Sequence, residues 1–195
     1  MKFLKYQENG GYHYKQYLDG GKFRKHADRI KNWVKEKNIL DVGAGDGTIT
    51  YMLRAKGIDN EMSALAIAKA VGVDVQFGDA YAIPYPDNSF DAILMADVIE
   101  HLEDPLKALT EAARVAPVLY ITTPPKGMVK DKYHVREWTP EEFPAYMRKR
   151  GWELDGEIEV VPEEKNMYAR FTRIDTKIPK NTFSLKDCKK ATFSW

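Results

Sequence analysis

The stretch that most constrains this chain is Ile39–Thr48, with the sequence ILDVGAGDGT. An apolar segment runs into Asp41, and glycines follow at the alternate positions Gly43, Gly45 and Gly47. Glycines at this spacing let the backbone turn sharply and let a ligand approach it without meeting a Cβ atom. The pattern is typical of a buried strand that ends where a helix begins, which is where open α/β sheets bind cofactors. It therefore predicts a nucleotide-binding turn.

The composition favours one soluble domain spanning residues 1–195. Hydrophobic residues make up 44% of the chain and charged residues 30%, as in an ordinary globular protein. No apolar segment approaches the roughly 20 residues of a membrane span, and no signal-peptide core is present. The single cysteine, Cys188, excludes an internal disulfide and a metal site built from a cluster of cysteines. We expect a cytoplasmic protein with a helical cover (1–38), a core (39–175) and a tail (176–195).

The small net charge of +1 is unevenly distributed. Residues 1–38 carry ten Lys and Arg against four acids, and residues 176–195 carry five against one. Solvated helix faces and a surface tail are the favoured interpretation, because no block of five like charges occurs. The alternative is that the basic ends attract an anionic substrate or a nucleic acid.

Apolar segments alternate with helical patterns through the middle of the chain. Strands are expected at 39–42, 55–59, 73–77, 90–95 and 117–122. Helices are expected at 22–37, 48–56, 62–70 and 104–115. The first of these helices is expected either to cover a cofactor site or to pack on the sheet edge, and its His26, like His13 before it, is expected at the surface. The alternation predicts an α/β fold with a parallel, doubly wound sheet.

The pattern changes after residue 122. A helix is expected at 139–150, where Thr139 and Glu142 have the spacing of a capping box. Strands at 152–161 and 167–175 follow with no helix between them, so this pair is expected to be antiparallel.

The glycine turn does not match two common phosphate-binding patterns. A dinucleotide site requires G-x-G-x-x-G, but the sixth position is Thr48. A P-loop requires a lysine after its last glycine, and none follows here.

The stretch ILDVGAGDG instead resembles the first motif of the class I S-adenosylmethionine-dependent methyltransferases. Four further segments are similar to that family in the same order, and the resemblance covers about residues 25–175. They are Gly57–Asp59, Gly78–Ala80, the block PYPDNSFDAILMADVIEHLEDP at Pro84–Pro105, and YHVREWTPEEF from Tyr133 onward. The long block is similar to the type 11 subfamily that includes the ubiquinone and menaquinone biosynthesis enzymes.

The resemblance implies a Rossmann-like sheet of seven strands in the order 3-2-1-4-5-7-6, with five parallel strands and the antiparallel pair. It also implies S-adenosyl-L-methionine as methyl donor and S-adenosyl-L-homocysteine (SAH) as product. The positions that match cofactor-binding residues of the family are Asp41, Gly43, Ala44, Gly45, Asp59, Asn60, Met62, Asp79, Ala80 and Asp97.

The chemistry of the cofactor fits the residues that the resemblance assigns to its site. Asp41 is expected to hold the ammonium of the amino-acid tail, and Asp97 lies where the family contacts that end. A ribose diol favours a carboxylate that accepts two O–H bonds, which the resemblance places at Asp59, with Glu61 as the alternative. Asp79 matches the acceptor for the adenine amine, and Met62 and Ile83 are expected against the adenine faces.

The distance along the chain from Gly47 to Asp59 is short for this family. Only eleven residues separate them, which a helix of two turns and a strand of three or four residues just fill. Asp46 and Asp104 are expected to act as helix caps rather than as ligands.

Methyl transfer requires positioning, and it requires a base only when the acceptor carries a proton with an unfavourable pKa. His101 and His134 are the candidates, with a structural role as the alternative for His101. Tyr12, Tyr14 and Arg136 are candidates to line the pocket. No His, Asp or Glu cluster has metal-ligand spacing in the sequence, so no metal is expected.

We expect a small-molecule acceptor, such as a metabolite or lipid precursor, and a monomer or homodimer. The segment TTPPK at Thr122–Lys126 departs twice from the motif of amino-group methylases, and it follows the fifth strand rather than the fourth. Nucleic acid is therefore not the favoured acceptor. The alternatives are an RNA or protein methyltransferase that uses the basic termini, and a regulator that binds the donor without catalysis.

Overall fold

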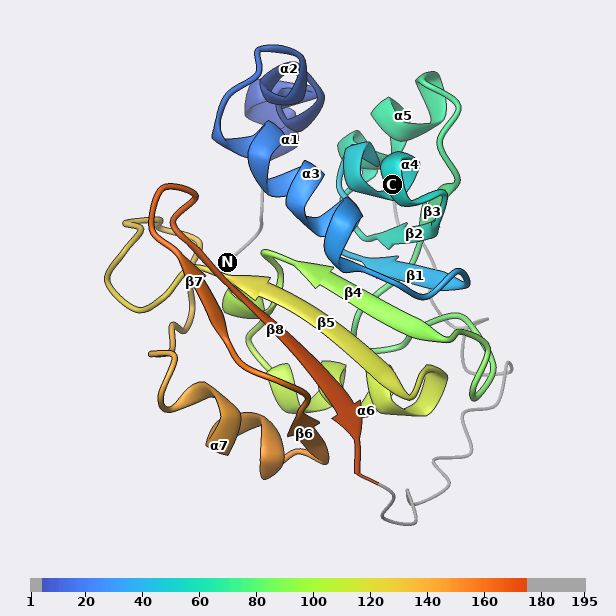
Figure 1. Cartoon of the computed structure of the whole chain (residues 1–195). Coiled ribbons are helices and arrows are strands. Elements are labelled where there is room, and N and C mark those ends of the chain that lie inside the picture. The colour runs from blue at the N-terminus through green and yellow to red at the C-terminus, as the bar shows by residue number, and fades with distance from the viewer. Residues whose placement is uncertain (1–4, 175–195) are drawn as a thin grey trace.

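The computed structural model describes residues 5–174, and an eight-stranded sheet forms its centre (Figure 1). The strand order is β3-β2-β1-β4-β5-β8-β6, and β7 also pairs with β8. The strands are β1 (Ile39–Val42), β2 (Lys56–Asp59), β3 (Val75–Phe77), β4 (Ala92–Ala96), β5 (Val118–Thr123), β6 (Trp152–Leu154), β7 (Glu159–Val161) and β8 (Asn166–Arg173).

Helices cover both faces of this sheet. They are α1 (Lys5–Asn9), α2 (Tyr12–Leu18), α3 (Lys22–Trp33), α4 (Thr48–Leu53), α5 (Met62–Ala70), the 3₁₀ helix η1 (Ile99–His101), α6 (Pro105–Val115) and α7 (Phe143–Arg148). In Figure 1, α1 to α5 lie above the sheet and α6 and α7 lie below it. No helix within residues 5–174 is long and apolar enough to cross a membrane.

The expected sheet is confirmed, with one correction. Strands β1 to β5 are parallel, and β8 lies antiparallel to β5. The single strand expected at 152–161 is two strands, because Gly156 has a φ of +90° and breaks the extended chain. Both pieces pair with the long β8, β6 near its end and β7 near its start. When β6 and β7 are counted as one strand, the strand order is the expected 3-2-1-4-5-7-6.

Two apolar cores lie on the two faces of the sheet. On one face, Ile30 of α3 packs in a cluster with Tyr120 of β5. On the other, α6 and α7 contribute Leu109 and Phe143 to a larger cluster that contains the fully buried Trp152. The central strands β1 and β4 are buried on both faces, which explains why their sequences read as continuous apolar runs.

Several element boundaries differ from the expectation. The expected strands after the first begin one or two residues before β2, β3, β4 and β5. Helix α4 ends at Leu53 because Arg54 adopts a left-handed conformation with a φ of +53°, and α3 ends at Trp33 because Val34 is extended. The six-residue α4 and four-residue β2 fill the short distance to Asp59 as expected.

The N-terminal and C-terminal helices correct two further expectations. Residues 5–18, within the expected helical cover, form α1 and α2. Helix α3 packs on the face of the sheet rather than on its edge. Helix α7 covers only part of the expected 139–150, although Thr139 and Glu142 exchange both hydrogen bonds of the capping box, at 3.0 and 3.3 Å. The expected tail, 176–195, lies outside the described residues.

Candidate functional site

The candidate site lies where the strand order reverses, between β1 and β4. Strands that leave this point in opposite directions open a crevice at their carboxyl ends. Gly43 follows β1 and Asp97 follows β4, so the two segments meet here. A Cβ atom on Gly43 would lie 2.5 Å from Cγ2 of Val98, which explains why only glycine fits between them.

The glycine turn is held by the carboxylate that ends β2. The Gly45 amide donates to Asp59 Oδ2 over 2.8 Å, and the Glu61 amide donates to Asp59 Oδ1 over 2.8 Å. Gly45 has a φ of +57°, and a Cβ there would lie 1.8 Å from the hydroxyl of Tyr6 in α1. Asp59 thus joins the turn to β2 while α1 lies directly against it.

Burial shapes the charges of the acids near this turn. Burial raises the pKa of Asp59, and the amides of Glu61 and Gly45 oppose that effect. Both Asp59 oxygens retain a lone pair after these two bonds, so the carboxylate can still accept two hydroxyls. Burial also raises the pKa of Glu61, whose Oε2 is buried and has no hydrogen-bond partner within the described part of the chain.

Asp41 is a buried acid inside β1. Its Oδ2 accepts a hydrogen bond from Thr50 Oγ1 at 2.6 Å, and its side chain is almost inaccessible to solvent. Burial, opposed by that hydrogen bond and reinforced by the charge of Asp59, raises the pKa of Asp41 to about 7. A carboxyl group in this state ionises readily when a cation arrives beside it.

Asp97 is fixed by a network that spans three elements. It has a φ of +55°, a backbone conformation that is uncommon outside glycine and clusters at functional sites. Its Oδ1 accepts from Thr122 Oγ1 at 2.8 Å and from Asn166 Nδ2 at 2.9 Å, and Nε2 of His26 lies 3.6 Å from Oδ2. Burial raises the pKa of Asp97, but His26, Asn166 and Thr122 together outweigh it, so the pKa lies below its usual value.

The N-terminal helices close one side of the crevice. Tyr6 Oη lies 2.7 Å from His13 Nδ1, and the His13 ring stacks on Phe23 with centroids 4.5 Å apart. Burial lowers the pKa of His13 to about 4, so this imidazole is neutral at neutral pH. His26 is 4% exposed. The expectation of a surface position is therefore wrong for His26, because α3 packs on the sheet instead of standing free.

One cavity of about 940 Å³ joins these parts. All the residues predicted to bind the cofactor, and both candidate bases, line it. They are Asp41, Gly43, Ala44, Gly45, Asp59, Asn60, Met62, Asp79, Ala80, Asp97, His101 and His134. Tyr12 lines it as well. Tyr14 and Arg136 do not line this cavity, and Ile83 is buried in the core beneath the sheet. The exposed side chains of Phe77 and Met62 both line the cavity.

One part of the cavity wall brings together side chains from two segments that are distant in the sequence. Glu100 and His101 lie on η1, and His134 lies on the loop after β5. One potential ligand atom of each lies within 4.8 Å of the other two. The sequence spacing gave no sign of this cluster, because 32 residues lie between His101 and His134. Burial strongly raises the pKa of Glu100 and lowers that of His101.

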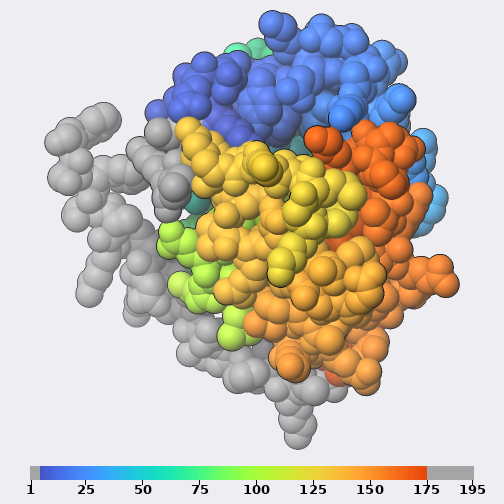
Figure 2. Space-filling model, turned by 90° about the vertical axis from the view of Figure 1, so that its left-hand side faces the viewer, coloured from blue at the N-terminus to red at the C-terminus, as the bar shows by residue number. Residues whose placement is uncertain are grey.

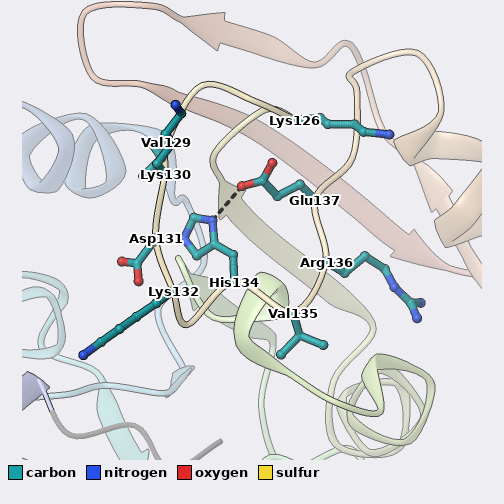
Figure 3. A pocket seen from close by; sticks show the side chains of 9 residues that line it. All are labelled: Lys126, Val129, Lys130, Asp131, Lys132, His134, Val135, Arg136 and Glu137. Carbon is teal, nitrogen blue, oxygen red and sulfur yellow. Dashed lines mark hydrogen bonds and ion pairs between the residues drawn. The ribbon is translucent and has the colours of Figure 1, made fainter.

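The loop that carries His134 also forms a shallow depression of about 600 Å³ (Figure 3). Its lining residues are Lys126, Val129, Lys130, Asp131, Lys132, His134, Val135, Arg136 and Glu137. Asp131 pairs with Lys5 of α1 at 2.5 Å. Figure 2 shows the N-terminal helices (blue) resting directly on this loop (yellow). Asp131 and His134 line both the depression and the main cavity, so the two spaces adjoin.

Comparison with known proteins shows what the segment around the glycine turn is similar to. A family model described as a methyltransferase domain matches residues 40–117, the segment that runs from β1 through the end of α6. Residues 40–117 are thus similar to a methyltransferase domain, as the resemblance in the sequence implies. The glycine turn, Asp59 and Asp97 all lie within this methyltransferase domain.

Curated relatives match the methyltransferase domain and part of its surroundings. The demethylmenaquinone methyltransferase of Thermus thermophilus is 38% identical over 118 residues, covering 51% of this chain and 54% of that protein. The ajmaline N-methyltransferase of Rauvolfia serpentina is 36% identical over 96 residues, covering 42% of this chain and 33% of that protein. The chain thus spans between a third and about half of the length of these relatives.

Solved structures share the fold at low sequence identity. A methyltransferase from Thermotoga maritima, described as a possible histamine N-methyltransferase, aligns with a TM-score of 0.71 and 22% identity, covering 86% of this chain and 98% of that one. The magnesium protoporphyrin IX methyltransferase of Synechocystis, solved with bound SAH, aligns with a TM-score of 0.63 and 12% identity, covering 78% and 84%. These likenesses support the fold of the methyltransferase domain.

Proposed function

We propose that this protein is an S-adenosylmethionine-dependent methyltransferase that acts on a small-molecule acceptor. One observation supports this proposal most directly. All the positions that match the family's cofactor site line one cavity, which lies where the strand order reverses. They come from the ends of four strands, so only the folded sheet brings them together. Relatives named for alkaloid, menaquinone and phosphoethanolamine methylation support a small acceptor.

The cavity fits the three parts of the donor. In our proposal the ionised form of Asp41 balances the ammonium of the amino-acid tail above Gly43. Asp59 accepts the ribose hydroxyls with its remaining lone pairs, and Glu61 is the alternative because its Oε2 is buried without a partner among residues 5–174. Asp79 and the Ala80 amide meet the adenine edge, while Met62 and Phe77 supply apolar contact to its faces.

The chain's part in the reaction is to position the acceptor and exclude water. The donor supplies a methyl carbon that its sulfonium already activates, and transfer is an in-line displacement. Tyr6 and Tyr12 close the cavity from the N-terminal side, which limits the access of water. His101 and His134 stay predicted proton acceptors on the wall opposite the glycine turn, for an acceptor whose nucleophile carries a proton.

The basic depression favours an acceptor with a negatively charged group. Lys126, Lys130, Lys132 and Arg136 surround it, while its acid Asp131 pairs with Lys5. The other acid, Glu137, accepts hydrogen bonds from the Gly127 amide and lies 2.9 Å from His134 Nδ1. We propose that an anionic part of the acceptor rests here while its nucleophile reaches into the adjoining cavity.

Two measurements test the proposed function in sequence. Isothermal calorimetry with S-adenosylmethionine is expected to show saturable binding to the full chain, and absence of binding would reject the proposal. A screen with radiolabelled methyl donor, against a small-metabolite extract and total RNA in parallel, is expected to label the metabolite fraction. Label in RNA alone would replace the small-molecule acceptor with a nucleic acid, and binding without label in any fraction would indicate a non-catalytic regulator.

A further inference from the structure

We propose that Glu100, His101 and His134 form a binding site for a divalent transition-metal ion on the acceptor side of the cavity. One ligand atom from each residue lies within 4.8 Å of the other two. Two imidazole nitrogens and one carboxylate oxygen are a ligand set that proteins use for zinc and for non-haem iron(II). The cluster lines the same cavity as Gly43 and Asp97, so an ion here would lie beside the site of methyl transfer.

The first evidence for the metal site is the carboxylate of Glu100. Its Oε2 accepts a hydrogen bond from Thr123 Oγ1 at 3.0 Å, which fixes the carboxylate in one orientation. Its Oε1 is buried, has no hydrogen-bond partner within the described residues, and lies 3.9 Å from His101 Nε2. A buried carboxylate oxygen without a partner costs free energy, and native structures contain few such atoms. The oxygen that lacks a partner is the one that faces the histidines.

The two histidines are held in the orientation that metal ligands need. His101 Nδ1 lies 3.0 Å from the Tyr133 carbonyl, which can only accept, so Nδ1 carries the hydrogen and Nε2 carries the lone pair. His134 Nδ1 lies 2.9 Å from Glu137 Oε1, as Figure 3 shows, and the same reasoning leaves its Nε2 with the lone pair. Metal-binding histidines characteristically donate their other ring N–H to a carbonyl or carboxylate in this way.

The backbone holds the two segments together without an ion. The amides of Val135 and Arg136 donate to the Glu100 carbonyl at 2.8 and 3.2 Å, so the loop with His134 is clamped to η1. The two imidazole centroids lie 5.1 Å apart. Ligand atoms around a tetrahedral ion are about 3.3 Å apart, so small side-chain rotations suffice to close the cluster on an ion.

Acidic side chains lie close to the cluster. Asp97 and Asp131 line the same cavity and Glu137 contacts His134, whereas the basic side chains of Lys126, Lys130, Lys132 and Arg136 line the adjoining depression. Lys5 brings a positive charge to this region, and its ammonium lies 2.5 Å from the Asp131 carboxylate, which offsets it.

The chemical role of the ion rests on the proposed function, whereas its binding does not. Three protein ligands leave coordination positions open for an oxygen of the acceptor. A bound hydroxyl would lose its proton to solvent more readily, because a metal ion lowers the pKa of its oxygen ligands. The oxygen would then form a bond to the methyl carbon as the carbon–sulfur bond breaks, with no change in oxidation state. In this proposal the histidine lone pairs hold the ion, and the ion takes over the role expected of a histidine base.

The test is metal binding by the full chain after treatment with a chelator. Calorimetry with Zn²⁺ and absorption spectroscopy with Co²⁺ are expected to show one ion bound per chain. Glu100→Gln and His134→Asn are expected to lower the affinity at least about 100-fold. Glu137→Gln, which alters the partner of His134 and the acceptor of the Gly127 amide but no proposed ligand, is expected to lower it about 10-fold. Glu103→Gln, an exposed glutamate on the same segment, is the matched control and is expected to bind as the wild type does.

Circular dichroism of each variant separates loss of ligands from loss of fold, and Glu137→Gln stays informative if a buried substitution unfolds the chain. Absence of stoichiometric binding, or equal affinity in Glu100→Gln and wild type, would overturn the metal site. Binding of the methyl donor without binding of the ion would reject the metal site and leave the proposed function standing. Ion binding without donor binding rejects the proposed function alone.

Discussion

The two halves of the cavity are built differently. The half proposed for the donor is assembled from the ends of adjacent parallel strands, and its acids lie in short segments such as Asp41–Gly47 and Asp59–Glu61. The half proposed for the acceptor consists of η1, the loop after β5 and the N-terminal helices. These segments are joined by contacts such as the Lys5–Asp131 ion pair and the hydrogen bonds from the loop to the Glu100 carbonyl. One half is fixed by the sheet, and the other is fixed by contacts between loops.

The difference shows how the two tasks separate in one fold. A strand end is held by hydrogen bonds on both sides, so residues placed there keep their geometry when distant parts of the chain change. A loop held by a few contacts can vary without disturbing the sheet. Variants in the donor half should therefore alter donor affinity, and variants in the acceptor half should leave it unchanged.

The largest expected effect comes from Gly45→Val. The new side chain would require an unfavourable backbone conformation and would collide with the Tyr6 hydroxyl, which lies 1.8 Å from the Cβ position. Donor affinity measured by calorimetry is expected to fall more than about 100-fold. Gly72→Val is the matched control, because its φ is +74° but nothing lies within 4 Å of its Cβ position. Wild-type affinity in Gly45→Val would show that the turn is not the donor site.

The ribose ligand can be assigned by comparing Asp59→Asn with Glu61→Gln. Hydrogen bonds to a charged group contribute about 1.5–3 kcal/mol, so loss of the Asp59 charge is expected to weaken donor binding about 30-fold. Glu61→Gln is expected to have a smaller effect. The reverse order of the two affinities would assign the ribose to Glu61, and equal, unchanged affinities would remove both carboxylates from the donor site.

Asp41 predicts a pH dependence of donor binding. Its pKa of about 7 in the free protein implies that the ionised form, which binds an ammonium, becomes dominant as pH rises through 7. Donor affinity is expected to increase about tenfold between pH 6 and pH 8, and Asp41→Asn should remove this dependence. A flat profile in the wild type would contradict the assignment.

The same raised pKa predicts the opposite trend for the stability of the free protein. Protonated Asp41 stabilises the fold fully at pH values below its ordinary pKa, and this contribution is lost as pH rises through about 7. The free energy of unfolding of Asp41→Asn is expected to lack this decline. Denaturant titrations of both proteins between pH 4 and pH 8 measure the difference.

The smallest effect is expected from the rim of the acceptor half. Replacing Lys130 and Arg136 by Gln removes two exposed charges, each contributing at most about 1 kcal/mol. The KM for an anionic acceptor is expected to rise about 3- to 10-fold, with unchanged donor affinity. An equal loss for a neutral acceptor would show that the effect is structural rather than electrostatic.

Much of the fold could be predicted because its signals are local. The glycine turn, the apolar β4 segment and the Thr139–Glu142 capping box each depend on residues close in sequence, and each lies where the sequence placed it. The errors occur where tertiary context decides. Gly156 divides an otherwise continuous strand, and His26, expected at the surface, is buried because α3 packs on the sheet.

The candidate site divides in the same way. Asp59 ends a predicted strand and Asp97 closely follows one, so both could be predicted as site residues. In the sequence, Glu100 is only an acid next to a histidine. Its burial, its bond to Thr123 and its approach to His134 depend on how the loop after β5 folds onto η1. The Asp97 network with His26 and Asn166 is equally invisible in sequence, because its members are separated by up to 140 residues.

The sequence by itself determined the glycine turn and the alternation of strands and helices, and hence where a donor site is predicted at the strand ends. It did so because backbone conformation and burial periodicity are properties of neighbouring residues. The tertiary structure alone decided the pKa of Asp41, the closure by Tyr6 and the meeting of Glu100, His101 and His134. These depend on burial and on contacts between distant segments, which are set only when the chain packs.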